Sequence, residues 1–408
     1  MKLLVVNIFF DPLSFGGATI VAEQMADQMS RRHGFEVVVV SARIGYLPAA
    51  SVVRHRTRSG LEAFNVGLPF IADFPTHYDN PRFTAQFREI LDYVEPDIVH
   101  VHCVQDIGAG FFDVLVERNV PFVVSVHDFW WVCERQFMIT AAGDVCEQRV
   151  IDPGVCVRCG ASRPQLERRL TYLKGQLAKA DLVIVPSRFV AGYAADNGIP
   201  ADKLVILPHG VPAPSLAPPR RSPEETVFGF VGGPGLHKGW DMIRNVFPRK
   251  GTSPAHLLIV DAGQRVGQPW RDRLAREATH LDMTIVPPYK PSTIDSFFSE
   301  IDVLLVPSIV RESFGLTARE ALLRDVWVIA ADAGALAEDI VDGENGAVLP
   351  YPPTESALAA AIEARIGKPK EPLPYKEKVF TIERQGKELA ALLSKVVDTR
   401  QRKLLGKQ

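Results

Sequence analysis

Two glutamates lie in the stretch of sequence that offers the most chemistry. Glu312 and Glu320 enclose residues 313–316, which read Ser-Phe-Gly-Leu. We expect a strand to end at Pro307 and a helix to begin near Gly315, which turns the main-chain N–H groups of residues 313–316 toward the carboxyl end of the strand. Glu320 would then lie about one and a half turns into the helix. The two carboxylates could therefore contact separated parts of one elongated ligand.

Two glycine-rich loops offer sites for an anion. Gly16 and Gly17 follow the first expected strand, and Gly232 and Gly233 precede Lys238 after the first expected strand of the second half. Glycine lets the main chain approach a ligand, the start of a helix attracts negative charge, and lysine can neutralise a phosphate. A plain turn is the other interpretation of the first loop. The first loop lacks the dinucleotide fingerprint and the second lacks the Gly-Lys-Ser/Thr of a P-loop, so nucleotide hydrolysis on magnesium is not supported.

Four of the five cysteines are close together in the sequence. Cys133, Cys146, Cys156 and Cys159 lie within 27 residues, and the last two form a Cys-x-x-Cys pair. Such a pair is the chelating element of many structural zinc sites. A long loop without regular structure would also be held by such a cross-link. The sequence therefore offers a structural zinc site as one interpretation and reduced thiols in a loop as the other.

The residues named so far belong to a pattern of alternating strands and helices that occurs in both halves of the chain. Near-continuous apolar runs alternate with amphipathic stretches, which is typical of parallel strands covered by helices on both faces. The expected strands are residues 3–10, 36–41, 97–103, 122–126, 182–186, 204–207, 226–231, 256–261, 283–286, 303–306, 326–330 and 347–349. The expected helices are residues 18–32, 82–94, 107–118, 164–180, 239–246, 269–280, 293–300, 316–323 and 355–366. The pattern predicts an α/β protein with two doubly wound domains.

Length and a proline-rich segment suggest where the domains divide. The chain has 408 residues, and a domain holds roughly 100–200. We expect a first domain at 1–211 with the cysteines on a loop at 129–163, a proline-rich linker at 212–223, and a second domain at 224–366. The tail at 367–408 carries eleven Lys and Arg against five acids. We expect it to form a helix that packs across both domains, and a membrane-surface helix is the alternative.

Composition excludes several classes of protein. Hydrophobic residues make up 47%, charged residues 23%, and the net charge is −2, which indicates a globular protein without the basic surplus of a duplex DNA binder. No segment reaches the ~20 apolar residues that a membrane span requires. Residues 1–10 read as a buried strand rather than a signal sequence, and the odd number of cysteines suits a reducing compartment. We expect a soluble cytoplasmic protein with no nucleic-acid partner, which would contact the inner membrane face peripherally if the tail is a membrane-surface helix.

A family resemblance follows from these residues. Glu312-x7-Glu320 with Ser-Phe-Gly-Leu inside resembles the signature of the retaining nucleotide-sugar glycosyltransferases of family 4. Weaker motifs fall in the order of that family: Gly16-Gly17-Ala18, Ser125-Val126-His127-Asp128, Pro208-His209-Gly210-Val211, Ala331-Asp332-Ala333-Gly334 and Asp342-Gly343-Glu344-Asn345-Gly346. In the third of these, His209 replaces the asparagine of the family. The resemblance implies the GT-B fold, in which two Rossmann-like domains face each other across a cleft and a C-terminal helix crosses over.

The resemblance also implies catalytic roles. Glu312 would bind hydroxyls of the transferred sugar, and His127 would be the catalytic histidine beside that sugar. Lys238 would stabilise the departing diphosphate. The implied retention would proceed by attack on the same face of the sugar, with the departing phosphate oxygen taking the proton of the acceptor.

The rest of the nucleotide-sugar site is implied in the same way. Glu320 would bind the ribose and Tyr289 would pack on the nucleobase, while main-chain N–H groups of Phe314–Leu316 would help to hold the diphosphate. The remaining expected contacts are Gly16, Gly17, Gly232, Gly233, Ser313, Phe314, Gly315 and Leu316. Gly233 occupies a position where the family often has arginine, so one phosphate-neutralising charge is missing unless His237, Arg244 or Arg311 replaces it.

The expected reaction moves a hexose-type sugar from a UDP- or GDP-sugar to a glycan, a lipid-linked or a small-molecule acceptor. The acceptor would meet loops at residues 43–80 and 129–163. No Asp-x-Asp motif is present, so we expect catalysis without a metal, and zinc is expected only in a structural role. Two alternatives stay open: a nucleotide-sugar 2-epimerase with the same fold, and a non-catalytic nucleotide-sugar binding protein, which the missing arginine suggests.

Overall fold

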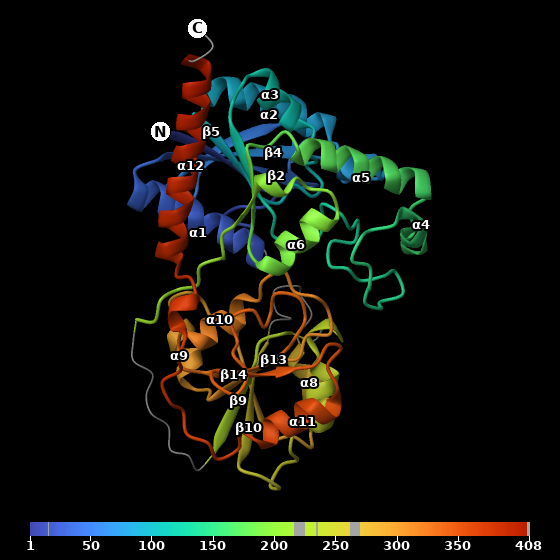
Figure 1. Cartoon of the computed structure of the whole chain (residues 1–408), viewed down its shortest axis with the longest axis vertical. Helices are drawn as coiled ribbons and strands as arrows, with labels where there is room; N and C mark the ends of the chain where they lie inside the picture. The colour runs from blue at the N-terminus through green and yellow to red at the C-terminus, as the bar shows by residue number, and fades with distance from the viewer. Residues whose placement is uncertain (15, 216–224, 234–235, 262–269, 406–408) are drawn as a thin grey trace. The chain divides into compact units, whose positions relative to one another are not determined.

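The computed structural model describes residues 1–14, 16–215, 225–233, 236–261 and 270–405. The chain divides into two compact units, of which residues 1–210 with 382–408 form the first and residues 211–381 form the second (Figure 1). Each unit is built around its own sheet. Most of the expected linker at 212–223 lies outside the described residues.

The first unit holds an eight-stranded sheet in the order β3-β4-β2-β1-β5-β6-β7-β8. The strands are β1 (Lys2–Val6), β2 (Glu36–Ile44), β3 (Val52–Arg56), β4 (Glu62–Leu68), β5 (Ile98–Val101), β6 (Phe122–Ser125), β7 (Leu182–Val185) and β8 (Leu204–Ile206). Neighbours pair in parallel except β3, which runs antiparallel to β4 at one edge. The β3–β4 hairpin occupies part of residues 43–80, where the sequence analysis expected a loop.

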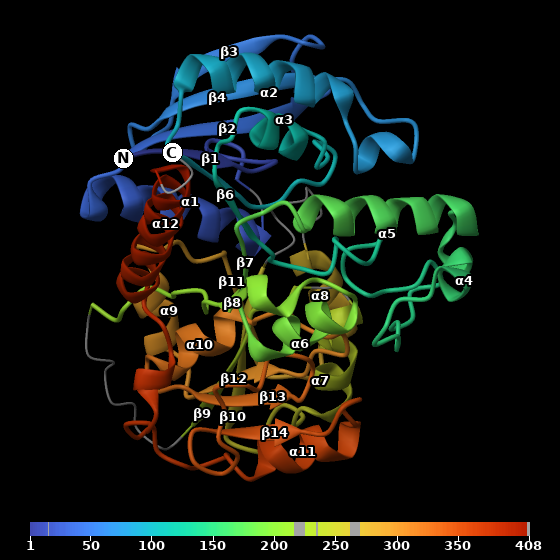
Figure 2. The ribbon, with the colours of Figure 1, turned by 45° about the horizontal axis from the view of Figure 1, so that its top comes forward.

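Helices cover both faces of this sheet. They are α1 (Gly16–His33), α2 (Pro81–Val94), α3 (Phe111–Glu117), α4 (Pro153–Cys156), α5 (Arg163–Leu177), α6 (Arg188–Asp196) and α12 (Ile382–Leu405), with 3-10 turns at Pro75–His77, Val157–Cys159 and Ala201–Lys203. Alternate residues of a strand point to opposite faces, and Leu4 and Val6 of β1 join one apolar cluster with Phe83 and Phe87 of α2. On the opposite face α1 and α12 lie side by side, as Figure 2 shows.

The second unit holds a six-stranded parallel sheet in the order β11-β10-β9-β12-β13-β14. The strands are β9 (Thr226–Phe230), β10 (Ala255–Val260), β11 (Met283–Val286), β12 (Val303–Val306), β13 (Trp327–Ala331) and β14 (Gly346–Leu349). The helices are α7 (Trp240–Val246), α8 (Trp270–Glu277), α9 (Ile294–Ser299), α10 (Leu316–Leu322) and α11 (Glu355–Glu363), with 3-10 turns at Leu236–Lys238 and Lys376–Lys378.

The core of the second unit consists of two apolar clusters. One joins α9 and α10 to the sheet through residues such as Phe298 and Leu322. The other joins α7, α8 and α11 through Trp240, Trp270 and Leu358. Helices thus pack on both faces of a parallel sheet, and the doubly wound architecture expected from the apolar runs is confirmed.

The end of the chain returns to the first unit. Residues 367–381 belong to the second unit and α12 belongs to the first. Gln385 of α12 accepts the N–H of Gly210 at 2.7 Å, and the apolar positions Leu389 and Leu393 are buried. Within the part of the chain that the structure describes, no helix is both long and apolar enough to cross a membrane.

Candidate functional site

The sheet of the second unit changes strand order at β9. One neighbour, β10, comes next in the chain, whereas the other, β12, comes much later. Doubly wound sheets bind ligands beyond the carboxyl ends of the strands at such a switch point. Gly232, Gly233 and Lys238 follow β9, and Glu312 follows β12. The fold therefore brings the second glycine loop to the first of the two glutamates.

Lys238 and Glu312 form an ion pair at this switch point. Lys238 Nζ lies 2.5 Å from Glu312 Oε1, and Ser308 Oγ donates to the same oxygen at 2.8 Å. The lysine side chain is 39% exposed and that of Glu312 is 18% exposed, so a ligand could reach both. Burial raises the pKa of Glu312, but the charge of Lys238 and the two hydrogen bonds outweigh burial and leave the pKa below its ordinary value. The carboxylate is therefore ionised and can accept hydrogen bonds.

The pairing of Lys238 with Glu312 depends on the glycine at position 239. Gly239, directly after Lys238, caps α7 with a φ of 79°. A Cβ atom added there would lie 2.2 Å from the carbonyl oxygen of Pro307, a distance that no side chain tolerates. Ser308, which follows Pro307, donates to Glu312. The close approach of the two main chains therefore sets where Lys238 stands relative to Glu312.

The Glu312 loop is also held by hydrogen bonds from its own main chain. The Glu312 N–H donates to the Ala333 carbonyl at 3.0 Å, and the Glu312 carbonyl accepts the Ala335 N–H at 2.9 Å. Gly315 then caps α10 with a φ of 89°, which favours glycine. Residues 331–334, which resemble a late motif of the family, thus support the loop through the main chain.

Glu320 and Tyr289 form a second pair in the same unit. The Tyr289 hydroxyl donates to Glu320 Oε2 at 2.8 Å, and the tyrosine ring stacks on Phe297 with centroids 5.0 Å apart. Burial raises the pKa of Glu320, and the hydrogen bond from Tyr289 and the charge of Arg324 offset only part of this effect. The two residues predicted for the nucleoside end of a donor are therefore in direct contact.

Arg319 supports this region, and sequence reasoning missed it. Its guanidinium is 1% exposed, pairs with Asp339 through Nε at 2.6 Å, and donates to the Ala335 carbonyl at 3.1 Å. It also lies over the Phe314 ring, 3.8 Å from the centroid. The sequence offered one sign of this role: Arg319 follows Ala318, which lies on the apolar face of the helix.

Two of the residues that could replace the charge missing at Gly233 have contacts of their own. Arg244 is held by Asp241 and Glu277. Arg311 lies over the ring of Tyr351, 5.5 Å from its centroid. Lys238 is thus the cation that the structure pairs with Glu312 at the switch point.

In the first unit the glycine loop follows β1, which is likewise flanked by β2 and β5 at a switch in strand order. Gly16 and Gly17 begin α1 and are exposed. Gly16 has a φ of 82°, and a Cβ there would meet nothing within 4 Å. Its need for glycine is therefore a matter of backbone conformation, and the open space leaves room for a ligand.

His127 lies in a row of buried histidines. His127 Nε2 is 2.9 Å from His102 Nδ1, and His127 Nδ1 is 3.2 Å from His209 Nε2. His100 lies beside His102, with ring centroids 4.0 Å apart, and bonds to Ser125. These rings line a small cavity with Val21, Met25, Ile184, Leu207, Gln385 and Leu389. Only His127 was predicted as a site residue. The His-Val-His alternation at residues 100–102 was the signal for His100 and His102, whereas His209 was noted only as a departure from the family motif.

Three histidines of this row, His100, His102 and His127, are neutral. Burial lowers the pKa of His127 to about 4, and burial together with the charge of His127 lowers that of His100 to about 3. Burial and the three neighbouring rings also lower the pKa of His102. A neutral ring has one N–H, so the proton between His102 and His127 can belong to either ring.

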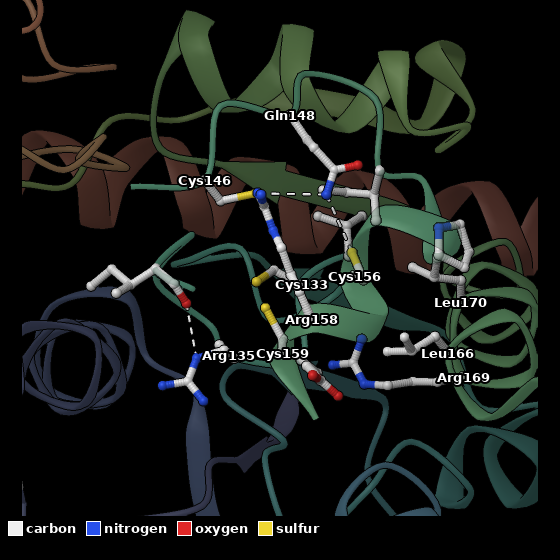
Figure 3. Close-up of a pocket in the computed structure, with 15 residues that line it drawn as sticks. Cys133, Arg135, Cys146, Gln148, Cys156, Arg158, Cys159, Leu166, Arg169 and Leu170 are labelled. Carbon is white, nitrogen blue, oxygen red and sulfur yellow. Dashed lines mark hydrogen bonds between the residues drawn. The ribbon is translucent and has the colours of Figure 1, made fainter. Parts of the chain in front are cut away.

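The four clustered cysteines all line one cavity of the first unit (Figure 3). Gln148, Arg158 and Arg169 line it with them. The long loop expected at 129–163 thus brings together the thiols that the sequence analysis grouped.

Comparison with known families defines the class of the protein. Residues 15–213 match the family described as Glycosyltransferase Family 4, and residues 216–379 match Glycosyl transferases group 1. The two matches coincide closely with the two units of the fold. The chain therefore belongs to the glycosyltransferases and has the GT-B fold of two Rossmann-like domains. It belongs to the family-4 type, as the motif resemblance indicated.

Individual relatives are more distant. A D-inositol 3-phosphate glycosyltransferase of Rhodococcus erythropolis is 32% identical over 36% of this chain and 35% of its own length. The chain spans about half or less of the length of the curated relatives that it matches. Sucrose-phosphate synthase from Thermosynechococcus elongatus shares the fold at a TM-score of 0.63 and 19% identity, with both chains fully covered. Anabaena HepE in complex with UDP gives a TM-score of 0.60 at 16% identity, also with both chains fully covered.

Proposed function

We propose that this chain moves a hexose-type sugar, with retention of configuration, from a UDP- or GDP-sugar to a hydroxyl of a glycan, a lipid-linked or a small-molecule acceptor. The observation that carries the proposal is the Lys238–Glu312 pair at the switch point of the second sheet. The UDP bound to Anabaena HepE supports a nucleotide-sugar donor. A cytoplasmic location, with peripheral membrane contact through the basic end of α12, stays a prediction.

The proposed reaction requires positive charge at the leaving group. The bond between the anomeric carbon and the β-phosphate oxygen breaks, and its electron pair stays on that oxygen. The acceptor oxygen forms the new bond on the same face of the sugar, and its proton passes to the departing phosphate oxygen. Lys238 stabilises the charge that grows there, and one such contact contributes roughly 2.7–4 kcal/mol. Because the ammonium supplies this charge, the proposal requires no catalytic metal.

The ion pair also suggests how Glu312 acts. In the structure the carboxylate holds the ammonium of Lys238. A diphosphate would compete for the ammonium, and the freed carboxylate oxygens could then accept hydrogen bonds from the transferred sugar. Glu320 and Tyr289 would take the ribose and the nucleobase. This division follows the family motif and suits the ionised state of Glu312.

His127 is the proposed catalytic group of the first unit. The motif implies a place beside the transferred sugar, and burial keeps the ring neutral. His102 and His209, which contact both of its ring nitrogens, would position that ring. We expect His127→Ala to keep nucleotide affinity within a few-fold and to lose transfer by roughly a hundredfold or more. Calorimetry with the nucleotide and a radiolabelled transfer assay separate the two effects. Near-normal transfer would remove His127 from the catalytic set.

The function is tested with the full chain in two steps. A thermal-shift panel of UDP, GDP, ADP and dTDP identifies the base, since a ligand at 100 times its Kd adds about 2.7 kcal/mol of stability. NMR of the matching nucleotide sugar, with and without a panel of acceptors, then follows the anomeric proton. Retained configuration in a glycoside product supports the proposal. Conversion without an acceptor would indicate an epimerase, and binding without any conversion would indicate a nucleotide-sugar binding protein.

The roles of the two glutamates can be separated by substitution. We expect Glu320→Ala to weaken nucleotide binding in calorimetry, whereas Glu312→Ala mainly lowers kcat. Glu300→Ala changes an exposed acid at the end of α9 and should leave both quantities unchanged. Equal and small effects of the two site variants on kcat/KM would contradict the assignment.

A further inference from the structure

The strongest feature that the transfer reaction leaves unused is the group of thiols in the first unit. Cys133, Cys146, Cys156 and Cys159 line a single cavity, as Figure 3 shows. The fifth cysteine, Cys103, is not among the residues that line it. Residues that lie up to 26 positions apart in the chain thus point their sulfurs toward one space.

The chain around this cavity has little regular structure of its own. Residues 126–152, between β6 and α4, are all described, and they contain turns and one isolated bridge between Ile139 and Val145. Cys133 and Cys146 belong to this stretch, whereas Cys156 ends α4 and Cys159 ends the 3-10 turn that follows. A loop of this length is uncommon in a compact domain, and a metal bound by the four cysteines would cross-link it.

Several hydrogen-bond donors and cationic side chains surround the sulfurs. Gln148 Nε2 donates to Cys146 Sγ at 3.6 Å and to Cys156 Sγ at 3.3 Å. Burial raises the pKa of Cys133 to about 11, and hydrogen bonds from the main-chain N–H groups of Arg135 and Met138 offset only part of this effect. In addition, the guanidinium-bearing residues Arg135, Arg158 and Arg169 line the cavity, and they would offset negative charge gathered there.

We propose that Cys133, Cys146, Cys156 and Cys159 bind one Zn²⁺ as a structural site of the first unit. The four thiols release four protons and the four thiolates take the metal, which leaves a net charge of −2 for the arginines to offset. Four sulfur ligands without histidine or carboxylate favour a soft or borderline metal in a closed tetrahedron. A closed site has no position for substrate, so its role is to hold the loop rather than to take part in transfer.

Metal binding must contract the site. No three of the four sulfurs, all among the described residues, lie within 4.8 Å of one another. With Zn–S bonds of ~2.3 Å, the edges of a tetrahedron of sulfurs are about 3.8 Å. The Gln148 amide, which now contacts two of the sulfurs, would have to withdraw. The lack of strand or helix in residues 126–152 leaves the main chain free to make this adjustment.

The first test is the metal content of the full chain, purified in reducing buffer without added metal or chelator. Mass spectrometry of the metals should find about one zinc per chain. The double variant Cys156→Ser/Cys159→Ser should lose it, and the matched control Cys103→Ser should keep it. Replacing zinc by Co²⁺ in the wild-type chain should give thiolate-to-cobalt charge-transfer bands and the visible bands of a tetrahedral ion, which does not depend on any variant folding.

The second test concerns the structural role. Removing zinc with a chelator should raise tryptic cleavage after Arg149 and Arg158 at least tenfold, whereas cleavage after Arg273 in the second unit should not change. Wild-type protein without zinc, iron with labile sulfide in its place, or disulfides among the four cysteines in non-reducing mass spectrometry would each overturn the proposal. Unchanged cleavage after zinc removal would overturn the structural role.

Discussion

The contact between Gly239 and Pro307 gives a test of how tightly the site is set. We compare Gly239→Ala with Gly251→Ala, because both glycines have a φ of 79° and only one is crowded. At Gly251 a Cβ would meet nothing within 4 Å, whereas at Gly239 it would lie 2.2 Å from the Pro307 carbonyl oxygen. The pair therefore separates the cost of backbone conformation from the cost of the clash.

The expected magnitudes follow from this geometry. A left-handed backbone costs a residue with a side chain about 1–2 kcal/mol, and both variants should lose this much stability. An ordinary contact begins near 3.4 Å, so in Gly239→Ala the two main chains must separate by about 1 Å, and overpacking of this kind adds about 1–3 kcal/mol. Lys238 and Ser308 move apart with them. Because a displacement of about 1 Å in a catalytic group can lower a rate by about 100-fold, we expect turnover to fall by that factor.

The assay is urea unfolding of the full chain together with release of nucleoside diphosphate from the sugar donor. Gly251→Ala should lose stability and keep its turnover, and Gly239→Ala should lose both. Equal turnover in the two variants would refute the reasoning, because it would mean that the contact at Pro307 does not position Lys238.

Three further predictions concern single side chains. Tyr289→Phe removes the hydrogen bond to Glu320, so calorimetry should show about fivefold weaker nucleotide binding, the equivalent of about 1 kcal/mol; an unchanged Kd would contradict the contact. Arg319→Met removes the buried guanidinium that pairs with the part-buried Asp339 and donates to the Ala335 carbonyl, so urea unfolding should show a loss of about 3 kcal/mol, and a loss within the error would contradict these contacts. Burial lowers the pKa of His127 to about 4 from 6.5, so its neutral ring contributes stability that is complete above pH 6.5 and is lost as the pH falls toward 4. Between pH 7 and 5 the wild type should therefore lose about 2 kcal/mol more than His127→Gln, and parallel losses would show a charged or solvated ring.

The sequence predicted the two parallel sheets because their strands are buried on both faces and read as apolar runs. Strands β3 and β4 escaped this rule. Strand β4 is buried, but Glu62, Asn65 and Gly67 interrupt its apolar residues. Strand β3 lies at the edge of the sheet. Its sequence, Val-Val-Arg-His-Arg, is mostly exposed in the structure, so it lacks an apolar run and the β3–β4 hairpin was taken for a loop. Strand β1 ends at Val6, earlier than the expected residue 10, although the main-chain N–H groups of Asn7 and Ile8 still donate to the carbonyls of Val40 and Cys103.

The candidate site was predictable in its parts and not in its contacts. Glu312 and Lys238 were found through separate motifs, but 74 positions separate them, and only the strand order of the second sheet brings them together. The contacts of His127 could not be predicted for the same reason, since His209 lies 82 positions further along the chain. Arg319 shows a different limit, because helical periodicity does not reveal that a charged side chain within a helix will be buried against the loop before it.

The position of α12 in the first unit has a consequence for synthesis. The chain leaves the first unit after Gly210 and returns to it at Ile382, so the second unit is an insertion within the first. The ribosome therefore makes the whole second unit before it makes the helix that packs on α1 and closes the histidine cavity through Gln385 and Leu389. The second unit can fold while it is still tethered to the ribosome, whereas the first must wait, with one face of its sheet partly uncovered, until residues 382–405 emerge.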